Sequence, residues 1–299
     1  MTEKNIENIT KSIKTIFDDQ LYNITNTTDT NINNKYPITF EIKTIENATC
    51  LILEFNEDYI YIDTLNRCGN NSGTYLLKKI DDLAALIPNI KYIGLKDGST
   101  IYNDNINLQF LKILAKGKSW YNSLGYISDN YENEKAHNEE LRNTTLIQLL
   151  EKCKDKLIQI FIKYRGKEVL LDDIKRYKEL SERSAYSKTM LQQTEQNYNN
   201  YDNYVSTEIK KIENKIETLK NDIENTYPNI DITTIKTREF FKYINSSIKL
   251  SNEEIILFEK LINVIAHVIL YDINLKKYID RDNVVLTKKG GKKKNHHKN

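Results

Sequence analysis

The stretch Asn70-Asn71-Ser72-Gly73-Thr74 is a turn of small and polar residues, and the elements on either side of it decide the fold class. After the turn, a helical pattern runs from Leu76 to Ile87, and a short apolar run from Ile90 to Leu95 predicts a strand. A second helical pattern covers Leu108 to Ala115. This order of parts is typical of proteins that combine a sheet with helices.

Three strand patterns come before that turn. Residues 38–43 alternate strictly between apolar and polar side chains, which predicts a half-buried strand. Residues 50–55 and 59–63 come next and are rich in β-branched and aromatic side chains. The link Asn56-Glu57-Asp58 is short enough for an antiparallel hairpin. Three strands followed by helix, strand and helix predict an α+β fold built on a mixed sheet.

The residues ahead of the first strand predict a helix and a linker. Apolar side chains recur every three or four positions in residues 5–22, which indicates one amphipathic helix. Residues 23–36 are rich in Asn and Thr and have no period, so we expect a loop or a disordered link there.

The C-terminal half predicts an all-helical domain over residues 138–285. Asn138 is expected to cap a long helix, and a second helix is expected over residues 170–180. Ser251-Asn252-Glu253-Glu254 is a capping box that opens an apolar helix through Leu270.

The polar segment 187–226 contains a regular apolar stripe. Its members are spaced close to 3.5 residues apart: Ile209, Ile212, Ile216, Leu219 and Ile223. This spacing is typical of a coiled coil, so it predicts a partner helix in the same chain or in another. We therefore expect a protein partner or self-association through residues 187–226. Tyr227-Pro228 ends the helix, because proline lacks the N–H that a helix needs.

These patterns divide the chain into four parts. They are an N-terminal helix and polar linker (1–37), an α+β domain (38–130), an all-helical domain (138–285) and a disordered basic tail (286–299).

Composition excludes several classes of function. The chain has 299 residues, and Lys+Arg 44 against Asp+Glu 42 leaves a formal charge of +2, so no overall field attracts nucleic acid or membrane. No apolar run approaches the roughly 20 residues needed to span a bilayer. No His, Cys, Asp or Glu spacing matches a metal site.

Cys50, Cys68 and Cys153 lie far apart and form no CxxC pair. An odd number of separated cysteines argues against a disulfide framework. With no apolar leader at the N-terminus, we expect an intracellular, reducing compartment.

The turn before the first predicted helix is a candidate anion site. Its members are Ser72, Gly73 and Thr74, and Arg67 lies nearby in the sequence. Free N–H groups at a helix N-terminus, together with the helix dipole, suit a phosphate or pyrophosphate. An ordinary strand-to-helix turn with Ser72 as its cap would give the same pattern, so both interpretations stay open.

The segment Trp120-Tyr121-Asn122-Ser123-Leu124-Gly125-Tyr126 adds a second motif. It is expected to end a helix and turn into a strand, with Gly125 in the left-handed conformation. With the preceding order of parts, it resembles the GCN5-related N-acetyltransferase (GNAT) family, whose second helix ends in a similar aromatic and glycine motif. The resemblance covers roughly residues 38–130.

The resemblance implies a function and a set of site residues. Acetyl-coenzyme A would be the cosubstrate, its pyrophosphate held by the five loop positions Arg67, Asn71, Ser72, Gly73 and Thr74. Tyr121 would be the general acid that protonates the departing thiolate. The sequence departs from the family in that Asn71 stands where the first family glycine belongs. Arg67 also falls one residue too early.

A general base for an acceptor amine has two candidates. Asp97 comes after the Ile90–Leu95 strand pattern, and Glu54 lies on an earlier strand. Each could hold a water molecule, and each could equally be a solvated surface carboxylate.

The chain also supports a function without catalysis. The fold would then be a scaffold, and the helical region would serve assembly. The Gly290-Gly291 lysine-rich tail could contact nucleic acid or acidic surfaces. That tail and the Asn-, Ile- and Lys-rich composition resemble proteins of large nucleocytoplasmic DNA viruses in style. This likeness would place the protein in a host cytoplasm or a virion, and it implies no activity.

Overall fold

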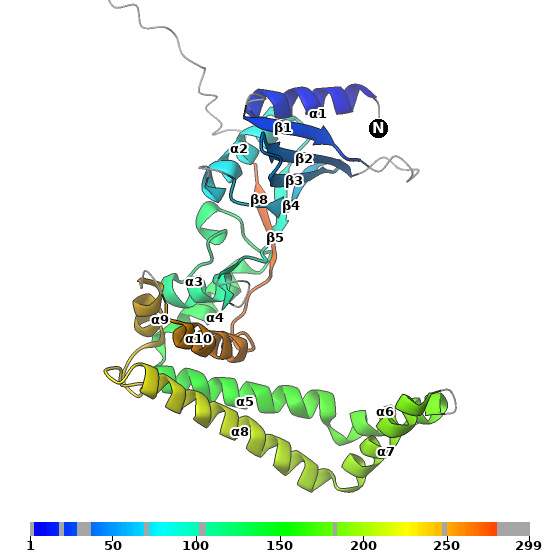
Figure 1. Ribbon diagram of the computed structural model, residues 1–299, viewed down its shortest axis with the longest axis vertical. Helices are drawn as coiled ribbons and strands as arrows, with labels where there is room; N and C mark the ends of the chain where they lie inside the picture. The colour runs from blue at the N-terminus through cyan, green and yellow to red at the C-terminus, as the bar shows by residue number, and fades with distance from the viewer. Residues whose placement is uncertain are drawn as a thin grey trace, which may run out of the picture. The chain divides into compact units, whose positions relative to one another are not determined.

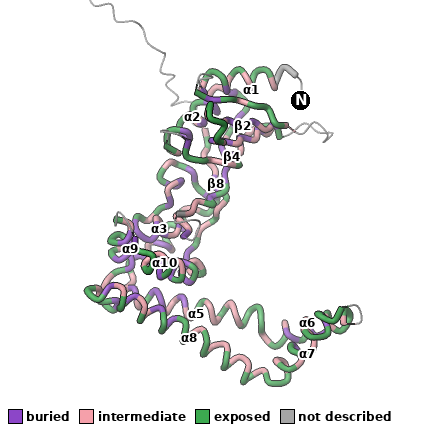
Figure 2. Tube along the Cα trace, viewed as in Figure 1, coloured by how far each residue is buried: buried purple, intermediate pink, exposed green. Residues whose placement is uncertain are grey.

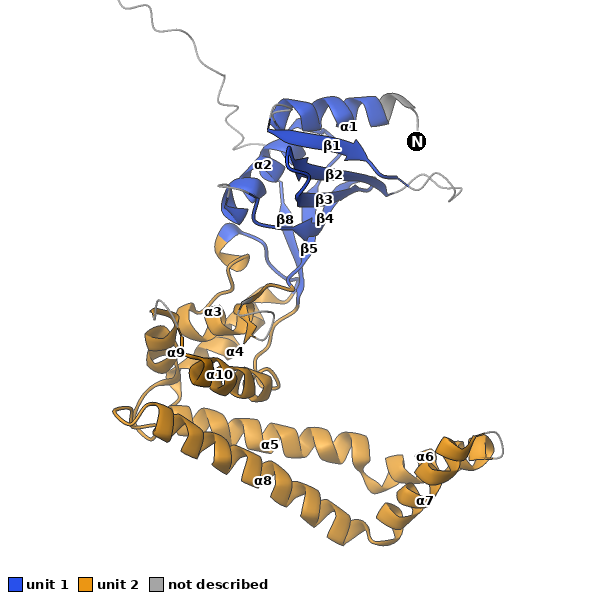
Figure 3. Cartoon of the chain, in the orientation of Figure 1, with its two compact units in different colours: residues 1–97, 124–129, 273–299 blue, residues 98–123, 130–272 orange. Residues whose placement is uncertain are grey.

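The computed structural model describes residues 3–17, 21–28, 37–68, 72–101, 106–181, 184–246 and 250–279, and it has a mixed α+β fold (Figure 1). The predicted fold class is therefore confirmed. The chain divides into two compact units, which are coloured in Figure 3 and are described here one at a time. Unit 1 contains residues 1–97, 124–129 and 273–299, and unit 2 contains residues 98–123 and 130–272. The basic tail and Asn71 lie outside the described residues.

Unit 1 is built on a six-stranded sheet with the order β1-β2-β3-β4-β5-β8. The strands are β1 (Tyr22–Asn26), β2 (Ile38–Thr44), β3 (Thr49–Phe55), β4 (Tyr59–Leu65), β5 (Tyr92–Lys96) and β8 (Asn274–Tyr278). Neighbouring strands run antiparallel, except that β4 and β5 are parallel and are joined through helix α2 (Gly73–Leu86). The predicted β3–β4 hairpin is confirmed, and the Asn56 N–H donates to the Tyr59 carbonyl oxygen at 2.9 Å.

The alternation in β2, β3 and β4 sorts their side chains between the two faces of the sheet. One face is apolar and buried, as at Phe40, Leu53 and Ile60, all at most 1% exposed. Helix α2 supplies buried side chains such as Ile80 to this core. Helix α1 (Glu3–Ile16) lies against α2, and the Lys79 Nζ donates to the Ile16 carbonyl oxygen at 2.5 Å.

Two strands of the sheet arise where the sequence predicted other structure. β1 lies in the segment expected to be a loop, and it forms because Tyr22 is buried beside Phe17, with ring centroids 5.7 Å apart. β8 lies within the segment assigned to the helical domain. It pairs with β5 and buries Leu275 on the apolar face of the sheet, so residues 274–278 belong to unit 1.

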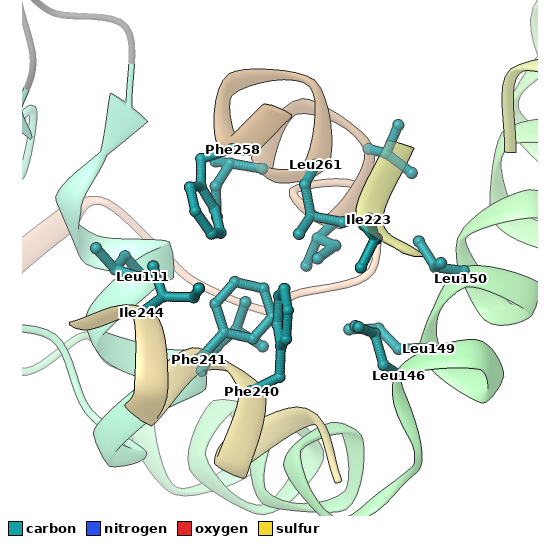
Figure 4. Close-up of a cluster of buried hydrophobic side chains, with 14 of the residues drawn as sticks. Leu111, Leu146, Leu149, Leu150, Ile223, Phe240, Phe241, Ile244, Phe258 and Leu261 are labelled. Atoms are coloured by element: carbon teal, nitrogen blue, oxygen red, sulfur yellow. The ribbon is translucent and has the colours of Figure 1, made fainter. Parts of the chain in front are cut away.

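Unit 2 is almost wholly helical. Its elements are the short strands β6 (Thr100–Ile101) and β7 (Ile106–Asn107), a 3-10 turn at Asn122–Leu124, and the helices α3 (Leu108–Lys116), α4 (Tyr131–Asn143), α5 (Leu146–Arg165), α6 (Lys167–Ser181), α7 (Ala185–Asn199), α8 (Tyr201–Thr226), α9 (Thr237–Ser246) and α10 (Asn252–Ile265). Figure 4 shows the centre of the core, where Phe240, Phe241 and Phe258 meet Leu146, Leu149 and Ile223. The predicted capping box is confirmed at Ser251, which opens α10.

The expectation that Asn138 caps a long helix is wrong. Asn138 lies inside α4, where its amide donates to the Leu270 carbonyl oxygen at 2.7 Å and accepts from the Leu270 N–H. The long helix α5 begins later, after Thr145, whose side chain forms a capping box with Gln148. A Thr with a Gln three residues on satisfies two free N–H groups together, so it makes the better start.

Helices α5 and α8 lie side by side and antiparallel. Lys220 near the end of α8 pairs with Glu151 near the start of α5, whereas Tyr204 near the start of α8 contacts Phe161 near the end of α5. Helices α6 and α7 form a hairpin between them. We call α5 to α8 the arm. In the described residues, no helix is long and apolar enough to cross a membrane.

Candidate functional site

The N-terminus of α2 is the predicted anion site. The helix begins at Gly73, and the Oγ of Ser72 accepts a hydrogen bond from the Tyr75 N–H at 3.2 Å. Ser72 is therefore a helix cap, which satisfies one free N–H. The N–H groups of Gly73 and Thr74 have no hydrogen-bond partner among the residues that the structure describes. Those two donors are available to an anion.

The charges around this helix end also suit an anion. The first turn of α2 has no acidic residue, so no carboxylate of that turn opposes the positive end of the helix dipole. Arg67 is exposed and lies six positions before Gly73 in the sequence. Asn71, the other predicted member of the site, lies outside the described part of the chain.

A disulfide joins the strand and the loop beside this helix. Cys50 on β3 is bonded to Cys68, with Cα atoms 5.4 Å apart and 18 residues of sequence separation. The expectation that the cysteines stay separate is thus wrong for this pair, because the sheet brings the start of β3 beside the chain that leaves β4. Of the three cysteines, only Cys153 is a free thiol. The reducing compartment stays a prediction.

Tyr121, the predicted general acid, lies in unit 2, whereas Ser72, Gly73 and Thr74 lie in unit 1. The Tyr121 side chain is 9% exposed, and its ring centroid is 4.7 Å from that of Trp120. The turn is held by Ser119 and Asn122, each of which donates its backbone N–H to the other's side chain at 3.1 Å. Tyr121 is therefore a buried side chain in a tightly bonded turn.

The sequence predicted that the aromatic motif ends a helix, and this prediction is wrong. Helix α3 has already ended at Gly117, which has φ +84°. Arg142 on α4 completes that helix end, because its Nε donates to the Leu114 carbonyl oxygen at 3.0 Å. The motif instead forms the 3-10 turn, and Gly125 comes next with φ +90°, the left-handed conformation that was expected for it.

A cluster that the sequence did not predict lies just after Gly125 in unit 1. Tyr126 is fully buried, and the Lys277 Nζ lies 5.4 Å from the centre of its ring. The same Nζ donates to Asp81 Oδ2 at 2.7 Å. Burial raises the pKa of Asp81, and Lys277 partly opposes that rise. Lys277 lies 196 residues from Asp81, so no local pattern could have paired them.

The two carboxylates considered as general bases lie in different surroundings. Asp97 is 2% exposed, so a solvated surface carboxylate is excluded for it. Glu54 is half-buried on the face of the sheet opposite α2. Burial raises the pKa of Glu54, and the nearby Asp63 raises it further.

A cavity of about 680 Å³ in unit 1 is lined by residues from α1, the β3–β4 turn and the segment before β5. It includes Glu57 and Pro88, and it does not include Ser72, Gly73 or Thr74. These lining residues precede β4 and β5, whereas α2 begins after the end of β4. The cavity thus lies at the amino ends of the parallel strands β4 and β5, whereas α2 begins beyond the carboxyl end of β4.

The arm presents a different kind of candidate surface. In α5 and α8 the buried apolar side chains lie in the halves that face the core of unit 2, as at Leu150 and Leu219 (Figure 2), and α6 separately buries Leu170 and Ile174. In α5 after Cys153, and in α8 before Ile216, every residue is half-buried or exposed. We call residues 154–165 of α5 and 201–215 of α8 the distal arm.

Within the described residues, no group of three or more His, Cys, Asp or Glu side chains could hold a metal ion. No protein-family model, no curated protein and no solved structure matches this chain.

Proposed function

We propose that unit 1 binds an acyl-coenzyme A through its pyrophosphate and transfers the acyl group, acetyl in the simplest case, to an amine. One observation carries the proposal. Helix α2 crosses between the parallel strands β4 and β5, and the N–H groups of Gly73 and Thr74 at its start have no hydrogen-bond partner in the described part of the chain. Ligands of sheets with parallel strands bind beyond the carboxyl ends of those strands, where such helices begin.

The residue types at that helix end support the proposal. Gly73 has no side chain, so a pyrophosphate can approach the backbone closely. The exposed Arg67 supplies a positive charge to the same loop. The order of the strands and of α2 is also the one that the GNAT resemblance implies. The GNAT resemblance implies Tyr121 as the general acid for the thiolate, and the acceptor is an amine whose identity the site does not specify.

Calorimetric titration with acetyl-coenzyme A tests the binding step. We expect micromolar affinity, which is lost in Gly73→Glu because the new carboxylate occupies and repels the anion site. Gly98→Glu is the matched control, since a Cβ at Gly98 meets no atom within 4 Å. The absence of binding at millimolar ligand would overturn the proposal, and so would equal loss of binding in both variants.

Turnover tests the catalytic step separately. Release of coenzyme A thiol in the presence of small and peptidyl amines should fall by about 10²-fold or more in Tyr121→Phe, which keeps the ring but loses the proton. Tyr186→Phe is the control, because Tyr186 is 71% exposed. If Tyr121→Phe turns over as fast as the unchanged protein, Tyr121 is not the acid.

The arm favours assembly as a second function. Five of the exposed large apolar side chains lie near the end of α5 and in α6 and α7: Ile162, Tyr164, Leu171, Leu180 and Tyr186. Surfaces of this kind mark contacts with other proteins. The tagged protein purified from cells that make it should therefore migrate as a complex. Val205→Glu, on the distal arm, should reduce it to the mass of one chain.

A further inference from the structure

We propose that the distal arm pairs with the distal arm of a second copy of this chain, through α8 and about a two-fold axis near Ser206. This inference rests on the second proposed function, assembly through the arm. It adds which molecule covers the arm, which face of α8 it covers and how the two helices are aligned.

The distal arm leaves its apolar side chains only partly buried. Ordering a residue costs about 1.5 kcal/mol, and a Leu or Ile side chain repays about 1.5–3 kcal/mol only when it is fully buried. Leu157 and Ile158 on α5, and Ile209 and Ile212 on α8, are all only half-buried. These half-buried side chains leave apolar surface on the distal arm that a partner would cover.

A groove on α8 is the face that such a surface would cover. It has a volume of about 520 Å³ and is lined by residues that recur every three or four positions, which places them on one side of the helix: Tyr201, Asp202, Val205, Ser206, Ile209, Lys210 and Glu213. Val205 and Ile209 make its middle apolar. Ser206, with its small side chain, allows another helix to approach closely.

The charges of the groove select its partner. Asp202 and Lys210 lie four residues before and four residues after Ser206. In an antiparallel pair of α8 helices about an axis at Ser206, each Asp202 lies opposite the Lys210 of the other copy, and both pairs form at once. The groove is therefore complementary to itself at these two positions. Nucleic acid or an anionic membrane would instead require one predominant positive charge.

The ion pairs and the apolar contacts of this interface have different effects. Exposed ion pairs contribute about 1 kcal/mol or less each, so the apolar side chains supply most of the affinity. The charges fix the register and exclude other partners, as flanking charges do in coiled coils. Reversing one of them places two like charges opposite each other at both ends of the interface.

Sedimentation equilibrium of the purified full chain, from micromolar to hundred-micromolar concentration, tests the proposal. We expect a monomer–dimer equilibrium that Lys210→Glu weakens about tenfold, a loss of about 1.4 kcal/mol. The double variant Asp202→Lys with Lys210→Glu should restore the dimer, because it exchanges the two charges. Lys211→Glu is the matched control, since Lys211 pairs with Glu208 of its own helix.

The outcomes separate this proposal from the assembly function. A chain that stays monomeric throughout, or a double variant that stays as weak as Lys210→Glu, would overturn the pairing. If the purified chain is monomeric while the protein from cells still migrates as a complex that Val205→Glu disrupts, only the self-pairing fails. If the protein from cells is also a monomer, the assembly function fails with it. Circular dichroism of each variant verifies that the helices are retained.

Discussion

Lys277 on β8 donates a hydrogen bond to Asp81 on α2, with 2.7 Å between Nζ and Oδ2. The pair ties the last strand of unit 1 to the helix that crosses between β4 and β5. Both side chains are half-buried, and the other oxygen of Asp81, Oδ1, is buried without a hydrogen-bond partner among the described residues. Desolvation therefore outweighs the attraction of Lys277, and the pKa of Asp81 is raised.

The raised pKa of Asp81 predicts a pH dependence of stability. Between the ordinary pKa of 3.8 and the higher folded-state pKa, the folded chain binds more protons at Asp81 than the unfolded chain does. The contribution of this site to the free energy of unfolding therefore falls as pH rises through that window. Relative to the unchanged protein, Asp81→Asn should become more stable as pH rises there and then level off. Urea unfolding at several pH values measures the difference.

Glu46→Gln is the control for that experiment, because Glu46 is an exposed carboxylate of unit 1 in the turn between β2 and β3. A difference that is flat with pH for Asp81→Asn, or one that Glu46→Gln reproduces, would contradict the assignment.

The cap of α10 predicts the opposite pH dependence. Glu254 accepts hydrogen bonds from the Ser251 N–H and the Tyr227 hydroxyl, each at 2.7 Å, and these bonds lower the pKa of Glu254. Its contribution to stability is present above the ordinary pKa of 4.5 and is lost as pH falls through the lowered folded-state value. The stability difference between the unchanged protein and Glu254→Gln should therefore shrink in acid. Glu253→Gln should show no such trend.

The same cap predicts the effect of replacing Ser251 with alanine, which changes no charge. Ser251→Ala removes the oxygen that accepts the Glu254 N–H, and it should lower the free energy of unfolding by about 1 kcal/mol at neutral pH. An unchanged midpoint in urea would show that the cap does not stabilise α10.

The sequence predicts those parts of the fold that a local pattern determines. β2, β3 and β4 alternate along the strand, and Ser251 with Glu254 forms a cap within one turn, so each is visible in a few residues. β1 and β8 escaped prediction because they are edge strands that bury few side chains, and pairing with a distant strand stabilises them. The same reason applies to the site. Ser72 as a helix cap is local, whereas Lys277 with Asp81 is a contact that only the sheet creates.

The disulfide predicts a loss of stability on reduction. A bridge that closes a loop of about this length stabilises a protein by about 3 kcal/mol, mainly by restricting the unfolded chain. The double variant Cys50→Ala with Cys68→Ala should lose that amount in urea unfolding of the oxidised protein. Reductant should lower the stability of the unchanged protein to the same level and leave the double variant unaffected. Equal stability of both proteins without reductant would contradict the bridge.

The burial of Cys153 predicts that its thiol reacts only after the protein unfolds. It is fully buried, and burial raises its pKa to about 12. Because the thiolate is the reactive form, a thiol reagent at neutral pH should not label the folded, oxidised protein. In urea the reagent should label one thiol per chain, and Cys153→Ala should abolish the labelling. Rapid labelling without urea would show that the core around α5 opens readily.

The two halves of α8 are buried to different extents. Shortening an apolar side chain to alanine should therefore lower the free energy of unfolding by different amounts in each half. Leu219 is 3% exposed in the core, so Leu219→Ala should cost about 3 kcal/mol, as buried leucines do. Ile209 on the distal arm is only half-buried, so Ile209→Ala should cost less than about 1 kcal/mol in dilute solution. Pairing of two copies would make that smaller cost grow with protein concentration, because association stabilises only the folded chain. Urea unfolding at two protein concentrations measures both effects. If Ile209→Ala costs as much as Leu219→Ala in dilute solution, the distal arm has a core of its own.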